Sequence, residues 1–370
     1  MTIRVLHVLP GLQHGDGMST VFMNYLRTVD HDEFVFDVIC HWPYDEDYKD
    51  EVERYGGNVT YYPKFNMSNI RESKKAVNNY FNSNASYDVV HCHMANAAFI
   101  YLKAARENGV PLRILHSHQD HYADSWTHAV RNYPLVAMGK HYANYYIACS
   151  EKAGDFLFRD KKYTILKNSI PTQQYRYDSV LRQQWREANS VENDIVFSNI
   201  GRLSLQKNQE FVLNVYSGIR NTLPSSKLFI AGDGELREEL RQHARQLGID
   251  EYVVWLGNTN HMNELYQGVD VLLFPSLYEG LPMTLIEAQA AGVSCLASDC
   301  ISEEAMVTDF VKELPIDQGV ALWIESSLNA VDRLAAVDRS AGAAAVRKAG
   351  FDIADTVHDL ENIYRTNIYI

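Results

Sequence analysis

Short apolar runs alternate with segments of helical periodicity along this chain, and that alternation restricts the fold more than any other feature of the sequence. Most of the apolar runs end in a polar or glycine-containing turn, after which a helix is predicted. The predicted strands are residues 3–9, 34–40, 58–62, 87–93, 112–116, 145–149, 195–200, 227–231, 252–256, 269–274 and 293–297. Strand–helix–strand units form parallel sheets that are covered on both faces and bind ligands at the carboxyl ends of their strands. The sequence therefore predicts an α/β protein with doubly wound sheets.

Two such sheets are predicted from the length of the chain. Its 370 residues exceed the size at which a single hydrophobic core stops growing, about 250–300 residues. The strand–helix alternation also stops in the polar stretch 172–193 and then starts again. We therefore expect a first domain of residues 1–172 and a second domain that begins at residue 173.

Charge is divided unevenly between the two halves. Residues 1–170 carry 18 Lys and Arg against 19 Asp and Glu, which leaves 16 against 28 for residues 171–370 out of totals of 34 and 47. The net charge of −13 argues against nucleic acid as a partner, and only the first half can approach an anionic membrane without strong repulsion. The chain has five scattered cysteines and no apolar run of about 18 residues, so we expect a cytoplasmic protein with reduced thiols.

The stretch from Phe274 to Gly292 combines a buried strand end, a turn and a helix, and it carries the carboxylates Glu279 and Glu287. Pro282 suits the first turn of that helix and Gly292 its end. A helix N-terminus offers free N–H donors and the positive end of the helix dipole, which together bind anions. The stretch therefore predicts a site for a diphosphate on the amides and for sugar hydroxyls on the carboxylates. The alternative is an ordinary connection in a doubly wound sheet.

Two cations, Arg202 and Lys207, follow the predicted strand 195–200 of the same half. Taken alone, such side chains are most often solvated surface charges. Beside an anion site at a helix N-terminus they would neutralise a diphosphate without a metal ion.

A glycine-rich turn lies between the first predicted strand and a predicted helix at 19–29, with Gly11, Gly15 and Gly17. Glycine allows the backbone to approach a ligand closely. The spacing is not that of the G-x-G-x-x-G fingerprint, so it does not predict a nicotinamide dinucleotide site. A tight turn without a ligand is the alternative.

Histidines end two of the predicted strands, His91 and His93 on one and His116 and His118 on the next. Residues two apart on a strand share a face, so the members of each pair are expected to point the same way. Hydrogen bonding from neutral imidazoles to a sugar is one interpretation. Zinc binding with the help of Asp120 is a second, although the sequence does not show that these side chains converge. Polar strand ends that face solvent are the third.

Four motifs, taken in order, resemble the donor-binding half of the retaining glycosyltransferases of family four, which have the GT-B fold. They are Gly201-Arg-Leu with Lys207, Gly232-Asp-Gly234, Leu256-Gly257, and Pro275-Ser-Leu-Tyr-Glu279-Gly-Leu-Pro with Glu287-Ala. The two glutamates eight residues apart are a signature of that family. In the first half, Gly15-Asp-Gly17 and Arg113-Ile-Leu-His-Ser-His118 resemble the branch that builds capsular polysaccharides and exopolysaccharides.

The resemblance implies the GT-B fold, in which two Rossmann-like doubly wound domains with parallel sheets face a central cleft. The domain of residues 1–172 would bind the acceptor, and the domain of residues 173–352 would bind the nucleotide sugar. The final helix, at about 353–370, would cross back to the first domain.

The resemblance also implies a set of donor contacts. Arg202 and Lys207 would bind the diphosphate and stabilise the leaving nucleotide. Glu279 would contact hydroxyls of the donor sugar, and Glu287 would bind those of the ribose. Amides from Gly280 to Thr284 would hold the phosphates, and the loop after Gly257 would hold the base. The remaining residues of the implied donor site are Gly15, Gly17, Gly232, Asn258, Leu281, Met283 and Leu285.

On the acceptor side, the resemblance implies that His116 is the histidine near the sugar, with His118 as its competitor. His14 and His118 are the candidate acceptor contacts. Many relatives have a glutamate shortly after the glycine pair, whereas this chain has Met18-Ser19-Thr20, a departure that concerns the acceptor.

The implied reaction moves a hexose from a nucleotide-diphosphate sugar, most simply a UDP-sugar, to a glycan or polyprenyl-diphosphate-linked acceptor. It retains the anomeric configuration, uses no cofactor or metal ion, and takes place near the inner face of the membrane. Two other hypotheses remain open from the sequence. One is a non-catalytic, sugar-nucleotide-binding subunit of a glycan-assembly complex, and the other is a metal-dependent hydrolase that uses the histidines.

Overall fold

The chain forms two compact units in the computed structural model, which describes residues 2–41, 47–83, 86–118, 126–159, 161–259 and 261–368. For residue 67 and residues 126–131 it describes the backbone alone. The first unit comprises Met1–Ser169 with Ile353–Ile370, and the second unit comprises Ile170–Asp352. The division falls close to the expected boundary after residue 172, and the final helix belongs to the first unit.

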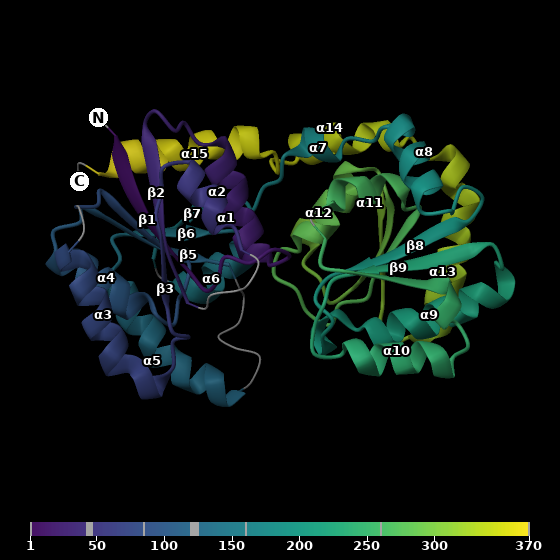
Figure 1. Ribbon diagram of the computed structural model, residues 1–370, viewed down its shortest axis with the longest axis horizontal. Coiled ribbons are helices and arrows are strands. Elements are labelled where there is room, and N and C mark those ends of the chain that lie inside the picture. The colour runs from purple at the N-terminus through teal and green to yellow at the C-terminus, as the bar shows by residue number, and fades with distance from the viewer. Residues whose placement is uncertain are drawn as a thin grey trace. The chain divides into compact units, whose positions relative to one another are not determined.

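The first unit is built on a seven-stranded parallel sheet in the order β3-β2-β1-β4-β5-β6-β7 (Figure 1). Its strands are β1 (Ile3–Leu9), β2 (Phe34–His41), β3 (Val59–Tyr62), β4 (Val89–Cys92), β5 (Leu112–Ser117), β6 (Tyr145–Ala148) and β7 (Thr164–Ile165). The chain winds outward from β1 to β3, crosses to β4 on the other side of β1, and then winds in the opposite direction. The switch point of this sheet therefore lies between β1 and β4, where open α/β sheets bind their ligands.

Helices cover both faces of this sheet. They are α1 (Gly17–Thr28), α2 (Lys49–Arg54), α3 (Ile70–Ser83), α4 (Ala98–Glu107), α5 (Trp126–Tyr142), α6 (Glu151–Phe158) and α15 (Ile353–Asn367). Helices α3, α4 and α5 pack together over one face, and α1 and α15 pack together over the other (Figure 1). Leu6 and Val90 belong to the core beneath α3 and α4. Because side chains alternate along a strand, the neighbouring His7 and His91 point to the face covered by α1 and α15.

The second unit repeats this plan with a six-stranded parallel sheet in the order β10-β9-β8-β11-β12-β13. Its strands are β8 (Ile195–Ile200), β9 (Ser226–Ala231), β10 (Val253–Gly257), β11 (Val271–Phe274), β12 (Ser294–Ser298) and β13 (Val311–Leu314). Its helices are α7 (Thr172–Tyr175), α8 (Ser179–Ala188), α9 (Gln209–Thr222), α10 (Arg237–Gln246), α11 (Met262–Gly268), α12 (Met283–Ala290), α13 (Gly319–Arg333) and α14 (Gly342–Lys348). The switch point of this sheet lies between β8 and β11. Two Rossmann-like units are thus present.

Local chemistry accounts for two of the differences between the predicted and the observed elements. Helix α1 begins at Gly17 rather than at residue 19, because Asp16 caps it by accepting a hydrogen bond from the Ser19 amide at 2.8 Å. Strand β13 was not predicted. It is an edge strand in which Lys312 and Glu313 are exposed, so it lacks the apolar run that marks the other strands.

Four of the five cysteine thiols are buried, and Cys300 is exposed. Among the helices in the described ranges, none is both long enough and apolar enough to span a membrane.

Candidate functional site

The loops that follow β8 and β11 carry the site residues predicted for the second unit. Both loops leave the sheet at the switch point, so they start from the same edge. Just before that edge, the side-chain amide of Asn199 in β8 donates to the backbone carbonyl of Leu273 in β11 at 2.8 Å. This bond holds the two strand ends together beyond their last ladder pair, Leu272 with Ser198.

Lys207 and Glu279, which come from these two loops, form an ion pair with 2.6 Å between Nζ and Oε1. The two side chains are only 15% and 10% exposed. The Lys207 ammonium also lies 4.9 Å from the centre of the Phe274 ring, a cation–π contact. The two residues predicted to act on the donor are therefore partners, and a phosphate that binds Lys207 must compete with the Glu279 carboxylate.

Three further hydrogen bonds fasten the two loops to each other. The amide of Leu277 donates to the Gln206 carbonyl at 2.8 Å, and the Gln206 side chain donates to the Tyr278 carbonyl at 2.9 Å. The Asn208 side chain donates to the Pro275 carbonyl at 3.2 Å. Lys207 and Glu279 are thus held on one assembled loop pair rather than on independent segments.

The loop after β11 leads into α12, whose N-terminus presents unpaired amides. Pro282 precedes α12 and has no N–H, and the Leu285 amide donates to the Pro282 carbonyl at 3.1 Å. In the described ranges, the amides of this segment that make no hydrogen bond are those of Gly280, Leu281, Met283 and Thr284. They follow Glu279 directly, so free donors and a buried cation meet at one place. This is the composition of an anion site.

Glu287, the second predicted glutamate, is buried and held by two tyrosines. Its Oε1 accepts from the Tyr175 hydroxyl and its Oε2 from the Tyr266 hydroxyl, each at 3.0 Å. Burial raises the pKa of the Glu287 carboxyl, and the two hydrogen bonds act in the opposite direction. Both carboxylate oxygens therefore have fixed partners, and Tyr175 and Tyr266 set the orientation of the group predicted to bind ribose.

Arg202 differs from Lys207 in its surroundings. It lies 3.1 Å from the carboxylate of Glu235, and the two side chains are 73% and 54% exposed. An exposed pair of this kind exchanges readily with solvent and ligands.

The glycines of the second unit have a steric role that their spacing did not reveal. Gly232 has a φ of +129°, and a Cβ there would lie 2.1 Å from the Gly201 carbonyl oxygen. The loop after β9 therefore passes directly against the loop after β8. Gly257 has a φ of +67° and faces open space, and the following Asn258 is exposed. Both remain candidates for contact with a base.

In the first unit, the turn before α1 contains Gly15 with a φ of +76°, a conformation that favours glycine. A Cβ at Gly17 would meet nothing within 4 Å, so packing within the first unit does not require glycine there. The ring of His14 packs edge-on against Tyr48 with 4.0 Å between their centres. The roles predicted for these three residues stay predictions.

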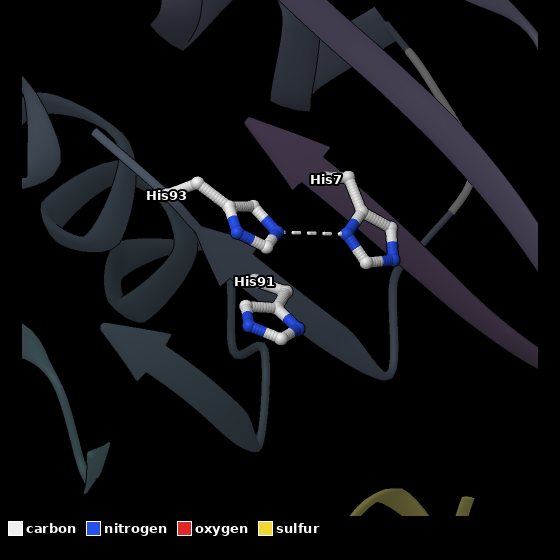
Figure 2. A group of neighbouring side chains, drawn as sticks. All are labelled: His7, His91 and His93. Carbon is white, nitrogen blue, oxygen red and sulfur yellow. Dashed lines mark hydrogen bonds between the residues drawn. The ribbon is translucent and has the colours of Figure 1, made fainter. Parts of the chain in front are cut away.

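Five histidines at the switch point of the first unit form one group, here called the histidine cluster: His7, His91, His93, His116 and His118. The two predicted pairs are confirmed, since the rings of His91 and His93 lie 4.3 Å apart and those of His116 and His118 lie 3.9 Å apart. The sequence did not identify His7, which is paired in register with His91 across β1 and β4. Figure 2 shows His7 on its own strand, facing His93.

Hydrogen bonds connect the rings of the histidine cluster in two chains. In one chain, His93 contacts His7 at 3.1 Å and His118 at 2.9 Å through its two ring nitrogens. In the other, His91 contacts His116 at 3.0 Å and the hydroxyl of Tyr364 in α15 at 2.7 Å. The imidazoles therefore converge, which the sequence did not show. Asp120, the carboxylate suggested for zinc, lies outside the described residues.

Burial keeps the imidazoles of the histidine cluster neutral. It lowers the pKa of all five rings, and neighbouring histidines lower it further for His7, His91, His93 and His116. The pKa of His118 falls to about 3. Neutral imidazoles offer one donor and one acceptor each, which suits hydroxyl groups of a sugar and also suits metal coordination.

Comparison with known proteins identifies the class. Residues 15–174 match the family described as Glycosyltransferase Family 4, and residues 182–333 match the family described as Glycosyl transferases group 1. EpsF of Bacillus subtilis, a protein assigned as a glycosyltransferase, is 30% identical over 98% of this chain and 96% of its own length. The chain therefore belongs to the family-four glycosyltransferases. This membership argues against the hydrolase hypothesis.

Two other comparisons bear on the fold and on related activities. An Escherichia coli protein named UDP-Gal:alpha-D-GlcNAc-diphosphoundecaprenol alpha-1,3-galactosyltransferase is 25% identical, covering 82% of this chain and 81% of its own. The crystal structure of Anabaena Alr3699/HepE in complex with UDP-glucose has a TM-score of 0.79 and 17% identity, covering 98% of this chain and 100% of the other. The GT-B fold expected from the motifs is confirmed.

Proposed function

We propose that this glycosyltransferase moves a hexose from a UDP-sugar to a glycan or polyprenyl-diphosphate-linked acceptor, with retention of anomeric configuration, in exopolysaccharide, capsular or cell-envelope glycan synthesis. The observation that carries the proposal is the Lys207–Glu279 ion pair directly before the free amides of α12. The names of the galactosyltransferase and of the UDP-glucose complex support the choice of donor, and the name of the galactosyltransferase also supports a lipid-linked acceptor.

In this proposal the leaving diphosphate is neutralised by the chain itself. Lys207 and the amides of Gly280 to Thr284 contact it within a largely buried site, and Arg202 approaches it from the surface. Preorganised donors of this kind stabilise the charge that develops as the sugar–phosphate bond breaks. No metal ion is needed for that step.

Binding of the donor would exchange the partner of Lys207. The ammonium turns from Glu279 to the phosphate, and the freed carboxylate accepts hydrogen bonds from the hydroxyls of the sugar. Glu287, held by Tyr175 and Tyr266, accepts from the ribose. Retention then follows if the acceptor hydroxyl attacks from the face that the nucleotide leaves, with its proton passing to the departing phosphate.

The acceptor is assigned to the first unit, with His14, His118 and the glycine turn as its contacts and His116 near the transferred sugar. Residues 1–170, which make up most of the first unit, are almost neutral in formal charge, so they tolerate an anionic lipid surface better than residues 171–370. This favours peripheral contact with the inner face of a membrane during use of a lipid-linked acceptor.

The test is a donor screen with the full chain, without acceptor and after chelation of metals. UDP-, GDP- and ADP-sugars are compared by calorimetry and by slow release of the nucleotide. We expect binding and release with one UDP-hexose, both reduced in Lys207→Gln and unchanged in Lys227→Gln. Lys227 is a lysine of β9 whose ammonium donates to the Glu251 carbonyl, so it is a matched control.

Addition of a polyprenyl-diphosphate-linked glycan then tests transfer, and NMR of the product gives its anomeric configuration. An inverted product would contradict retention. Tight donor binding without release or transfer to any such acceptor would support the non-catalytic subunit instead. Absence of binding to every donor would overturn the proposed donor site.

A further inference from the structure

The histidine cluster contains more imidazoles than contact with one sugar requires. Three of its members, His93, His116 and His118, form a group whose candidate ligand atoms all lie within 4.8 Å of one another. His93 and His118 are half-buried and follow β4 and β5, whereas His116 is buried. The group therefore lies at the carboxyl edge of the sheet, and two of its members are partly exposed.

Among the candidate ligand nitrogens of these rings, one has no hydrogen-bond partner and two contact each other. His116 uses Nδ1 toward His91, and its Nε2 is buried without a hydrogen-bond partner. His93 uses Nε2 toward His7 and Nδ1 toward His118, so an ion has to replace the contact between His93 and His118. That Nδ1 lies 2.9 Å from Nε2 of His118. Two nitrogens bound to one tetrahedral zinc ion lie about 3.3 Å apart, so a small outward movement of either ring admits an ion.

The residues behind this group have the arrangement that supports metal-bound histidines. A ligating imidazole is usually oriented through its other ring nitrogen by a second hydrogen-bonding group. Here His91 holds His116 and is itself held by the Tyr364 hydroxyl at 2.7 Å, while His7 holds His93. Once the ion replaces the His93–His118 hydrogen bond, the tautomers that free the ligand nitrogens are compatible with the bonds to His7, His91 and Tyr364.

We propose that His93, His116 and His118 bind one late first-row transition-metal ion of the zinc class through three imidazole nitrogens. The ligand set is all nitrogen, which favours zinc, copper, nickel and cobalt over magnesium and calcium. Three protein ligands leave one coordination position for water or a hydroxyl group.

This ion would use His116 and His118, which the proposed function assigns to the transferred sugar and the acceptor, so metal binding and direct sugar contact by these imidazoles are alternatives. It does not involve the donor contacts, in which Lys207 and the amides of α12 neutralise the diphosphate. Chelation is therefore expected to leave donor binding intact. Failure of the metal site would not affect the donor proposal, and failure of the donor proposal would not affect the metal site.

A second trio, His7, His91 and His93, is an alternative set of ligands for the metal ion (Figure 2). It shares His93 but lies deeper, with His7 and His91 only 2% and 1% exposed. Each trio contains a residue whose two ring nitrogens are already engaged, His91 in the inner trio and His93 in both. Access therefore favours the outer trio.

The experiment uses the full chain without a polyhistidine tag, stripped with chelator and then titrated with Zn²⁺ by calorimetry and with Co²⁺ by visible absorption. We expect one ion per chain with a Kd below about 1 µM, and intense ligand-field bands typical of tetrahedral cobalt. X-ray absorption of the zinc-loaded wild type is expected to show three imidazole ligands. This measurement does not depend on whether any variant folds.

Variants assign the ligands. His118→Gln is expected to weaken zinc binding at least about 100-fold, and His7→Gln, which supports a ligand indirectly, by about tenfold. His141→Gln changes an exposed histidine of α5 and is expected to have no effect. Loss in His7→Gln with retention in His118→Gln would overturn this ligand set in favour of the inner trio. Weak, six-coordinate binding that neither variant changes would overturn the metal site altogether.

Discussion

The two switch points of this molecule are built alike in the backbone and differ in the chemistry of their side chains. The β8/β11 edge carries a buried ion pair and free helix amides, whereas the β1/β4 edge carries the five neutral imidazoles of the histidine cluster. The parallel sheet determines where ligands bind. Charge determines which ligands bind. The β8/β11 edge therefore suits a diphosphate, and the β1/β4 edge suits uncharged groups that accept or donate hydrogen bonds.

The two sites also differ in what holds their side chains before a ligand binds. Lys207 and Glu279 neutralise each other, and in the proposed function they exchange partners when a phosphate binds. The histidine cluster has no carboxylate partner among the contacts described, and it stays neutral because it is buried. We therefore expect one site to respond to anions and the other to protons and metal ions.

The largest expected effect concerns acid and the first unit. The folded-state pKa values of the five clustered histidines lie below the unfolded value of about 6.5, so the unfolded chain binds more protons once the pH falls below about 6.5. The stability that these neutral histidines contribute is therefore fully present above about pH 6.5. It is lost progressively as the pH falls from there to the folded-state pKa, which is about 3 for His118. Each histidine contributes up to about 1.4 kcal/mol per pH unit.

Hydrogen exchange between pH 7 and pH 5, without metal, measures this loss in each unit separately. We expect protection to fall by several kcal/mol in the first unit and much less in the second. Replacing His91 by glutamine, which does not titrate, should make the first unit's pH dependence shallower by about 1.4 kcal/mol per pH unit. Equal acid sensitivity of both units would contradict the role of the histidine cluster in the pH dependence of the first unit.

The next effect concerns the ion pair of the second unit. Glu279→Gln keeps the shape of the side chain but removes the charge that faces Lys207. We expect kcat for donor turnover to fall about 10²- to 10³-fold, the range for loss of one preorganised electrostatic contact. Steady-state kinetics with Lys227→Gln as the control measures it. A kcat within about threefold of wild type would contradict the role of this pair.

Much of this arrangement was predictable from the sequence, because it depends on local patterns. The strands at 3–9 and 195–200 and the helix at 126–142 have the bounds that their apolar periodicity predicts. Lys207 and Glu279 were expected at one edge, because parallel strands of a doubly wound sheet end together.

The site features that were not predicted from the sequence depend on strand register and on contacts between segments that are far apart in the chain. His7 is a single polar residue within an apolar run, and its position beside His91 follows from the pairing of β1 with β4, which local pattern does not encode. Tyr364 reaches the histidine cluster from α15, 273 positions away from His91. Tyr175 reaches Glu287 from α7, 112 positions away. A buried glutamate that needs hydrogen-bond donors was the one available signal for such partners.

A smaller effect tests how Glu287 is positioned. Tyr175→Phe removes one of the two hydroxyls that hold its carboxylate and leaves the ring. One such hydrogen bond contributes about 1–1.5 kcal/mol, so donor affinity should fall about 5- to 10-fold with little change in kcat. Tyr177→Phe is the matched control, since the ring of Tyr177 lies 4.5 Å from the Arg339 guanidinium and does not hold Glu287. Equal affinity of the two variants for UDP would show that the Tyr175 hydroxyl does not contribute to the donor site.

The smallest expected effect separates the exposed ion pair from the buried one. Arg202 and Glu235 are 73% and 54% exposed, and exposed pairs contribute at most about 1 kcal/mol. Glu235→Gln should therefore change the free energy of unfolding by less than about 0.5 kcal/mol and kcat by less than about twofold. Arg202→Gln should be equally mild for stability but should raise KM for the donor, because it removes a cation that the diphosphate uses. If both substitutions leave KM unchanged, Arg202 is only a surface charge, and the diphosphate of the donor depends on Lys207 and the amides of α12 alone.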